Sequence, residues 1–275
     1  MMAEPRIELR QVYKSFGNKQ VLRGVSLSAR QGETLAIIGQ SGVGKSVILK
    51  LMVGLIKPDR GMVLVDGEDI NDAGEESLFR IRKKFGFLFQ GSALLDSLTV
   101  EENVGLGLTE HLSFSQGEIR RIVADKLGMV GMQGVEDYLP SDLSGGMKKR
   151  VGLARAIAME PEIILYDEPT TGLDPITADS INELIVYLKN RLAITSVVVT
   201  HDMTSVRRVA DRVAMLHDGE IIFTGTMAEL DITDNPVVRQ FIEGRAEGPI
   251  KPAFAMKADQ DNGLLSTVIT LNGEI

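Results

Sequence analysis

A glycine-rich stretch at residues 39–46 constrains the fold of this 275-residue chain more than any other feature. Its pattern is Gly, four residues, then Gly-Lys-Ser. The apolar run 34–38 before it predicts a short buried strand, and residues 46–52 after it predict a helix. Glycines let the backbone turn sharply and direct N–H groups at phosphate oxygens, where the helix dipole also favours an anion. The predicted nucleotide-binding residues are Gly39, Gln40, Ser41, Gly42, Val43, Gly44, Lys45, Ser46 and Val47.

Two side chains of this stretch suit a triphosphate. Lys45 is expected to reach the β- and γ-phosphates, and the Ser46 hydroxyl is expected to ligate Mg²⁺. The alternative is a glycine-rich turn that matches the pattern by chance, which the flanking strand and helix disfavour.

Composition excludes several other classes of protein. The chain has no cysteine, which rules out disulfides and thiolate metal sites and suits a reducing compartment. No apolar run approaches the roughly 18 residues of a membrane-spanning helix, and the N-terminus lacks the apolar core of a secretory signal. We therefore expect a chain that is soluble by itself and needs a partner for any membrane role. A net charge of −8 argues against broad binding to nucleic acid.

Strand and helix patterns alternate along most of the chain, which predicts an α/β fold with a mostly parallel sheet covered by helices. From residue 99 to about residue 139, apolar residues fall at helical spacing and predict an inserted helical subdomain. Beyond about residue 245 the pattern weakens, and proline and glycine predict an extension without regular structure. The predicted strands are residues 7–12, 21–28, 34–38, 62–65, 85–89, 163–166, 195–200, 213–216 and 221–224.

Two adjacent carboxylates follow the apolar run 163–166. An apolar strand of this kind delivers Asp167 to the carboxyl edge of the sheet, where doubly wound folds bind ligands. Asp167 suits the coordination sphere of Mg²⁺, and Glu168 suits a base that polarises water. The alternative is an acidic junction between a strand and a turn.

A second candidate anion site lies at residues 143–147, Leu-Ser-Gly-Gly-Met, which we call the signature turn. It precedes a basic amphipathic helix, so Ser144, Gly145 and Gly146 offer N–H groups and a hydroxyl at a helix N-terminus. Two anion sites in one chain make sense if each serves a nucleotide held by a second copy. A simple helix N-cap followed by a glycine turn is the alternative.

These motifs, in this order, resemble the ATP-binding cassette (ABC) family over residues 7 to about 241. The family signature is Leu-Ser-Gly-Gly-Gln, so Met147 departs from it at the last position and removes a polar contact near the nucleotide. The resemblance implies a P-loop NTPase fold with a RecA-like parallel sheet core, an antiparallel β subdomain and an inserted α-helical subdomain at about 91–160. It also implies an ATPase domain at 4–244, an extension at 245–275, and ATP and Mg²⁺ as cofactors.

The resemblance assigns further roles. Phe16, or with less support Tyr13, would stack on adenine, and Gln90 would contact Mg²⁺ and the attacking water. His201 would contact the γ-phosphate, and residues 173–174 would lie at a dimer interface. The predicted catalytic residues are Glu168, His201, Lys45 and Gln90, and the predicted metal-binding residues are Ser46, Gln90 and Asp167.

Four segments are similar to the Mla/Mce-associated ATPases: residues 89–104, the signature turn, residues 174–177 and residues 238–249. Those ATPases drive phospholipid movement between the inner and outer membranes of Gram-negative bacteria. The resemblance implies a homodimer on the cytoplasmic face of the inner membrane, held there by an integral permease. It also implies a Mce-domain lipid-binding protein, and a small regulatory subunit near the C-terminal extension. The segment 91–100 would form the groove for the permease, although its leucines also suit core packing.

Two alternatives remain at this stage. The chain could be the ATPase of an importer for another solute, or a soluble ABC regulator that has no permease.

Overall fold

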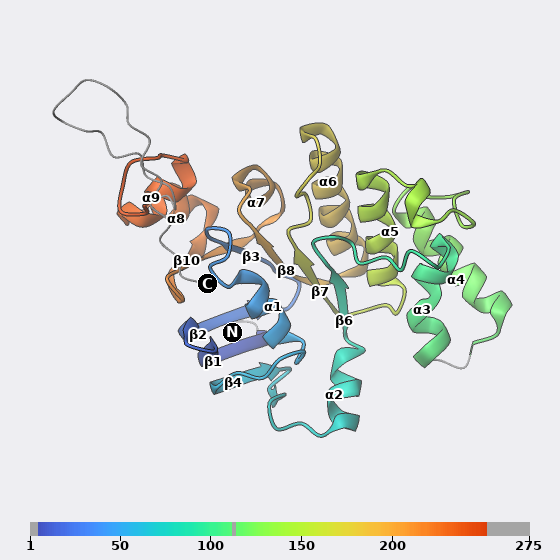
Figure 1. The fold of residues 1–275 in the computed structure, drawn as a ribbon, viewed down its shortest axis with the longest axis horizontal. Helices are drawn as coiled ribbons and strands as arrows, with labels where there is room; N and C mark the ends of the chain where they lie inside the picture. Colours follow the sequence, from blue (N-terminus) through green and yellow to red (C-terminus); the bar gives the residue numbers. More distant parts are fainter. Residues whose placement is uncertain (1–4, 112–113, 252–275) are drawn as a thin grey trace. The chain divides into compact units, whose positions relative to one another are not determined.

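The structure is a computed structural model that describes residues 5–111 and 114–251. The chain divides into two compact units, 1–228 and 229–275, which are described separately. The first unit contains two sheets and most of the helices (Figure 1). Across the described ranges, no helix combines the length and the hydropathy required to span a bilayer.

The larger sheet has six strands in the order β10-β9-β3-β8-β7-β6. All neighbours pair in parallel except β10, which pairs antiparallel with β9. The strands β3, β7 and β8 are buried along their whole length, which explains their continuous apolar sequences. The strand bounds are Thr34–Ile38 (β3), Phe85–Leu88 (β6), Ile163–Asp167 (β7), Thr195–Thr200 (β8), Arg212–His217 (β9) and Glu220–Thr226 (β10).

The smaller sheet is antiparallel, with the order β2-β1-β4-β5. A turn at residues 17–18 joins β1 (Pro5–Phe16) to β2 (Lys19–Arg30). Both strands run further than the predicted 7–12 and 21–28. The register of β1 shifts between Leu9 and Val12, and Gln11 has a φ of 47°. Such a bulge interrupts the alternation on which the prediction depends. The other strands are Arg60–Val65 (β4) and Glu68–Asp69 (β5).

A hydrophobic cluster extends from one face of β6, β7 and β8 into the helices that pack on it. Val104 and Leu108 of α3 pack there with Val123 and Leu127 of α4, as the helical spacing predicts. The α3, α4 and α5 helices group beside β6 in Figure 1, whereas α1 lies between the two sheets. The helix bounds are Lys45–Met52 (α1), Glu75–Arg82 (α2), Val100–His111 (α3), Gln116–Met129 (α4), Gly145–Ile157 (α5), Pro175–Leu192 (α6) and Met203–Val209 (α7), with a 3₁₀ turn at Pro140–Asp142 (η1).

The chain crosses into the second unit within α8 (Met227–Asp231), and α9 (Pro236–Glu243) follows. Gln240 of α9 is buried and holds the segment after the helix. Its side-chain amide donates to Ile250 O at 2.8 Å and accepts from Ile250 N at 2.6 Å. Most of the predicted extension, residues 252–275, lies outside the described residues.

Candidate nucleotide-binding and hydrolysis site

The loop at residues 39–44 requires glycine at its two ends. Gly39 has a φ of 151°, and a Cβ there would lie 2.3 Å from Leu216 O. Gly44 has a φ of 113°, and a Cβ there would lie 2.7 Å from a methyl group of Val21. The loop therefore runs close to β9 and β2 before α1 begins at Lys45.

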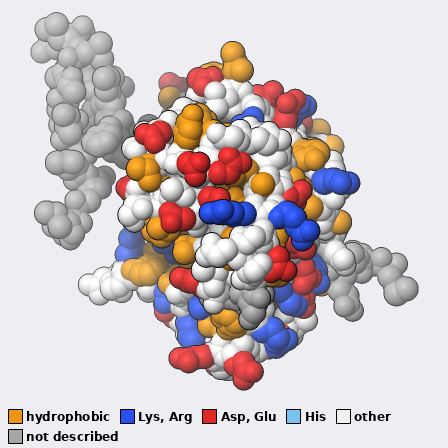
Figure 2. Space-filling view, turned by 90° about the vertical axis from the view of Figure 1, so that its right-hand side faces the viewer, with side chains coloured by type: hydrophobic (Ala, Val, Ile, Leu, Met, Phe, Trp, Pro, Cys, Tyr) orange, Lys and Arg blue, Asp and Glu red, His pale blue; other side chains and the backbone are white. Residues whose placement is uncertain are grey.

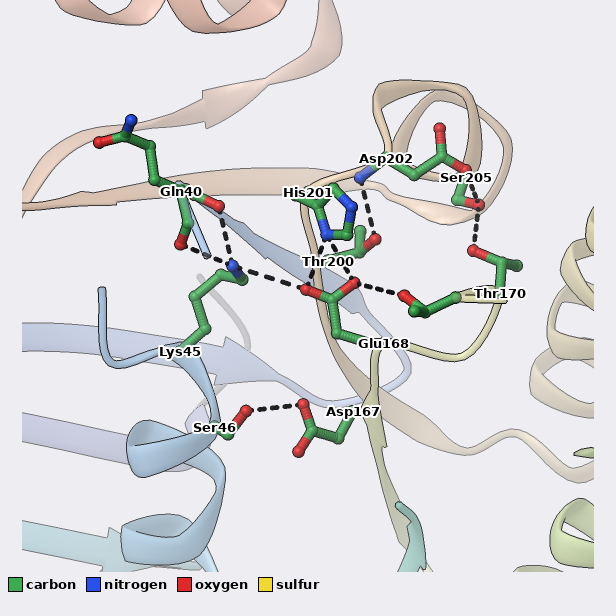
Figure 3. Close-up of polar contacts among 12 residues, drawn as sticks. Gln40, Lys45, Ser46, Asp167, Glu168, Thr170, Thr200, His201, Asp202 and Ser205 are labelled. Atoms are coloured by element: carbon green, nitrogen blue, oxygen red, sulfur yellow. Dashed lines mark hydrogen bonds and ion pairs between the residues drawn. The ribbon is translucent and has the colours of Figure 1, made fainter. Parts of the chain in front are cut away.

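Lys45 is buried, with 5% of its surface exposed, at the start of α1. Its ammonium donates to Gly39 O at 2.8 Å and to Gln40 O at 3.0 Å. It also lies 3.5 Å from Glu168 Oε1 (Figure 3). Burial lowers the pKa of Lys45, and the charges of Glu168 and Asp167 act in the opposite direction.

Ser46 and Asp167 bring a hydroxyl and a carboxylate together from α1 and β7. Ser46 Oγ donates to Asp167 Oδ1 at 2.8 Å. Burial raises the pKa of the Asp167 carboxyl, and the hydrogen bond from Ser46 opposes that rise. Hard oxygen donors suit Mg²⁺, which proteins hold with one or two carboxylates together with substrate phosphates. The donor set therefore fits the predicted metal.

Glu168 and His201 meet at the carboxyl ends of neighbouring strands. His201 Nδ1 lies 3.0 Å from the Glu168 carboxylate (Figure 3). Thr171 Oγ1 donates to the same carboxylate at 3.2 Å. Glu168 adopts a left-handed backbone conformation with a φ of 48°, and its N–H donates to Val199 O at 2.9 Å. A non-glycine residue in this conformation is a strained element of the kind that clusters at functional sites.

A cavity of about 330 Å³ joins most of the predicted nucleotide-binding residues with three of the four predicted catalytic residues, Lys45, Gln90 and Glu168. Phe16 lines its wall with half of its surface exposed, as a stacking residue would require. Tyr13 instead lies under Arg60, whose guanidinium is 4.2 Å from its ring centroid. The lining residues are Phe16, Val21, Ser41, Gly42, Gly44, Lys45, Ser46, Val47, Gln90 and Glu168.

The signature turn does not line this cavity. Ser144 is the N-cap of α5, and its hydroxyl accepts from Met147 N at 3.3 Å. The two glycines pack closely on the segment after β7. A Cβ on Gly146 would lie 2.6 Å from Thr177 Cγ2, and a Cβ on Gly145 would lie 3.4 Å from Leu173.

Three residues at the site are absent from the sequence prediction: Val21, which lines the cavity, Thr171 and Lys149. Thr171 hydrogen-bonds Glu168, and its spacing of three from that residue is the only signal for it. Lys149 is buried, and its ammonium donates to the carbonyls of Gln90 and Glu168. Its sequence shows only one of several basic residues on an amphipathic helix.

Curated relatives match most of the chain. The protein TRIGALACTOSYLDIACYLGLYCEROL 3 of Arabidopsis thaliana is 44% identical, over 89% of this chain and 75% of its own length. The probable ribonucleotide transport ATP-binding protein mkl of Mycobacterium leprae is 42% identical, over 89% of this chain and 70% of its own length. The intermembrane phospholipid transport system ATP-binding protein MlaF of Escherichia coli K12 is 40% identical, over 89% of this chain and 91% of its own length.

Solved structures share the fold. A dimeric post-hydrolysis state of the ATP-binding cassette MJ0796, bound to ADP and phosphate, has a TM-score of 0.74 and 36% identity. The match covers 80% of this chain and 98% of the other. The family model described as "ABC transporter" matches residues 22–171. This range includes the glycine-rich stretch 39–46, the signature turn, Asp167 and Glu168. The chain therefore belongs to the ABC transporter family and is one of its ATP-hydrolysing cassettes.

Proposed function

We propose that this chain is the ATPase subunit of a transporter that moves phospholipid between the inner and outer membranes of a Gram-negative bacterium. The observation that carries the proposal is the 40% identity with MlaF over 91% of that protein's length. The cavity that Lys45, Gln90 and Glu168 line together adds support. The Arabidopsis relative, which is named after a galactolipid, adds support.

Each site residue has a role in this proposal. The N–H groups of residues 39–46 and the Lys45 ammonium hold the β- and γ-phosphates of ATP, and Phe16 stacks on adenine. Ser46, Asp167 and Gln90 would hold Mg²⁺, which neutralises charge on the phosphate oxygens when bound. Glu168 orients and polarises the attacking water, and His201 contacts the γ-phosphate while its hydrogen bond fixes the Glu168 carboxylate.

The proposed assembly is a head-to-tail homodimer in which the signature turn completes the partner's site. Ser144 and Gly145 are exposed and lie outside the cavity of their own chain, which leaves their N–H groups available to a second nucleotide. Ile176 precedes Thr177, which Gly146 packs against, and its side chain is 84% exposed, so in the proposed dimer this side chain is available to the partner. The structure of MJ0796 is a dimer bound to ADP and phosphate, which supports the formation of a dimer.

The segment 91–100 is the proposed contact with an integral permease on the cytoplasmic face of the inner membrane. Leu95 is 46% exposed, whereas Leu94 packs against the cluster formed by α3, α4 and α5. Buried Asn103 fixes this segment through hydrogen bonds to Leu95, Leu98 and Thr99. The leucines therefore divide between the two predicted uses, a surface for a partner and core packing.

Further proposed partners are a Mce-domain lipid-binding protein and a small regulatory subunit near residues 245–275. Nucleic acid is not a proposed partner. The face shown in Figure 2, on the side of α3 and α4, intersperses acidic and basic side chains and presents no continuous basic surface among the described residues.

Purification of the tagged full chain from solubilised membranes, followed by transport assays, tests this proposal. A permease and a Mce-domain protein should co-purify, and the reconstituted complex should move a fluorescent phospholipid in an ATP-dependent way. The same complex carrying Glu168→Gln is the matched control. ATP-dependent movement of a labelled ribonucleotide instead of lipid would favour the activity named for the mycobacterial relative. Recovery without any membrane protein would favour a soluble regulator.

A further inference from the structure

The helix α5 contacts the nucleotide site through the buried side chain of Lys149. This side chain lies five residues after Ser144 in the sequence and is only 4% exposed. Its ammonium donates to the backbone carbonyl of Gln90 and, at 3.2 Å, to the backbone carbonyl of Glu168. The Lys149 ammonium therefore connects α5, the helix that follows the signature turn, to Gln90 and Glu168. Both are predicted catalytic residues, and both line the nucleotide cavity.

The same face of α5 holds the residues that follow Gln90. A Cβ on Gly152 would lie 2.8 Å from Leu88 and 3.4 Å from Ser92, so the helix and the loop pack without a gap. Arg155 donates to the carbonyls of Ser92 and Ala93. Positions 149, 152 and 155 recur every three residues, so they share one side of the helix.

The loop held in this way is strained. Ser92 and Ala93 have φ values of 60° and 47°, a left-handed conformation that steric contacts of the Cβ disfavour in non-glycine residues. Two consecutive residues keep such a conformation only where surrounding contacts determine it. The hydrogen bonds from α5 are contacts of this kind, so the position of the loop depends on the position of the helix.

Burial of the Lys149 ammonium costs free energy, because the charge loses its hydration. Burial lowers the pKa of Lys149, and the charges of Asp167 and Glu168 act against that effect. A methionine would fill a similar volume without the cost of desolvating a charge. The chain nevertheless has an ammonium at this point, where it binds two main-chain oxygens that a thioether could not hold.

We infer that Lys149 is a positioning residue for ATP hydrolysis, which sets the places of Gln90 and Glu168 relative to the helix that begins at the signature turn. Misplacement of a reacting group by about 1 Å can cost 100-fold in rate, so this link affects turnover more than nucleotide affinity. The inference relies on the proposed roles of Gln90 and Glu168. It adds that α5 connects two parts of the same chain: the signature turn, which is proposed to bind the partner's nucleotide, and the hydrolysis residues Gln90 and Glu168.

Lys149→Met in the full chain, with Lys148→Met on the adjacent, partly exposed residue as the control, tests the inference. For Lys149→Met we expect kcat to fall by about tenfold or more, while KM for ATP and the Kd of a fluorescent ATP analogue stay within about twofold. Hydrogen exchange of the peptide 88–98 should accelerate in the nucleotide-free protein. Lys149→Arg, which keeps the charge and the donors, should recover most of kcat, and Lys148→Met should match the wild type in every measurement.

Three results would overturn the inference. They are a kcat for Lys149→Met equal to that of Lys148→Met, a parallel loss of nucleotide binding and kcat, or a Lys149→Arg variant no more active than Lys149→Met. If Lys149→Met does not fold, Lys149→Gln takes its place. Its amide keeps a donor but is one bond shorter than lysine, so we expect its kcat to lie below that of Lys149→Arg with unchanged nucleotide affinity, and a kcat equal to that of Lys148→Met would overturn the inference. Glu168→Gln measured in parallel separates the two proposals. Normal turnover in Glu168→Gln would remove the role of Glu168, whereas loss of turnover there with a normal Lys149→Met would remove only the role of Lys149.

Discussion

His201 Nδ1 lies 3.0 Å from the Glu168 carboxylate although 33 residues separate them in the sequence. The pairing of β7 with β8 brings them together. Asp167 is opposite Val199 in this parallel register, so the residues that follow the two strands leave the sheet side by side. The distance between Glu168 and His201 is therefore determined by the pairing of the two strands.

Glu168→Gln should retain ATP binding and lose at least about 99% of turnover. The amide is isosteric and can still bond Thr171 and His201, but it cannot act as a base or draw a proton from water. Steady-state hydrolysis and a nucleotide titration check this result. ATP should also shift the variant to a dimer in light scattering. Turnover near the wild-type rate would exclude Glu168 as the base.

Lys45→Ala should lose nucleotide affinity in addition to turnover. The ammonium is already desolvated and oriented by Gly39 O and Gln40 O, so binding of a triphosphate needs little reorganisation of this side chain. Titration with a fluorescent ATP analogue should show a Kd at least about tenfold weaker, because a buried ammonium–phosphate contact is worth more than about 1.4 kcal/mol. An unchanged Kd would contradict the placement of Lys45 on the phosphates.

Asp167→Asn should stabilise the protein that lacks nucleotide and Mg²⁺. Burial raises the pKa of the Asp167 carboxyl, so the folded state binds this proton more tightly than the unfolded chain does. The ionised carboxylate therefore costs stability at neutral pH, and the cost disappears as the pH falls below its ordinary range near about 4. The melting temperature of Asp167→Asn should exceed that of the wild type at pH 7.5, with a difference that shrinks as the pH falls to the ordinary aspartate pKa near about 4.

The Asp167→Asn variant should also gain less from Mg²⁺ and ATP than the wild type, because it lacks the carboxylate proposed for the metal. The wild type measured with and without both ligands is the control. If Asp167→Asn melts at a lower temperature than the wild type at every pH, the Asp167 carboxylate stabilises the protein that lacks nucleotide and Mg²⁺, and the prediction is wrong.

Gly39→Ala should destabilise the fold more than Gly42→Ala does. Both glycines have positive φ, but a Cβ on Gly39 would collide with Leu216 O, whereas a Cβ on Gly42 meets no atom within 4 Å. Gly42→Ala should therefore cost only the backbone term of roughly 1–2 kcal/mol. Urea unfolding measures the loss in free energy of unfolding for each variant. Equal losses would mean that the close approach of Leu216 O does not exclude a side chain at residue 39.

The sequence predicts the buried part of the fold well because a strand covered on both faces has a continuous apolar sequence. The strands β3 and β8 begin and end at the predicted residues, 34–38 and 195–200. Partly exposed elements are harder to delimit. The bulge at Gln11 interrupts the alternation of β1. The apolar spacing predicts a helix from residue 178 to residue 192, whereas α6 already starts at Pro175, because Asp174 caps it and proline suits its first turn.

The site divides in the same way. Residues within local motifs, such as Lys45 and Ser46, are predictable because a short loop determines their environment. Lys149 is not, because a basic residue on an amphipathic helix usually faces water, and only the packing of α5 against the loop after Gln90 buries it. The contact between His201 and Glu168 lies between these cases, since the sequence places each at the end of a strand and the sheet order brings them together.

The register between β7 and β8 also limits how chains of this kind can change in length. Adding or removing one residue within either strand would slide its carboxyl end by about 3.3 Å and turn the following side chains to the opposite face. Glu168 and His201 would then no longer meet. Residues 71–74, an irregular connection between β5 and α2, carry no such constraint. Insertions and deletions among related chains should therefore accumulate in such connections, and a gap inside β7 or β8 should mark a chain that no longer hydrolyses ATP.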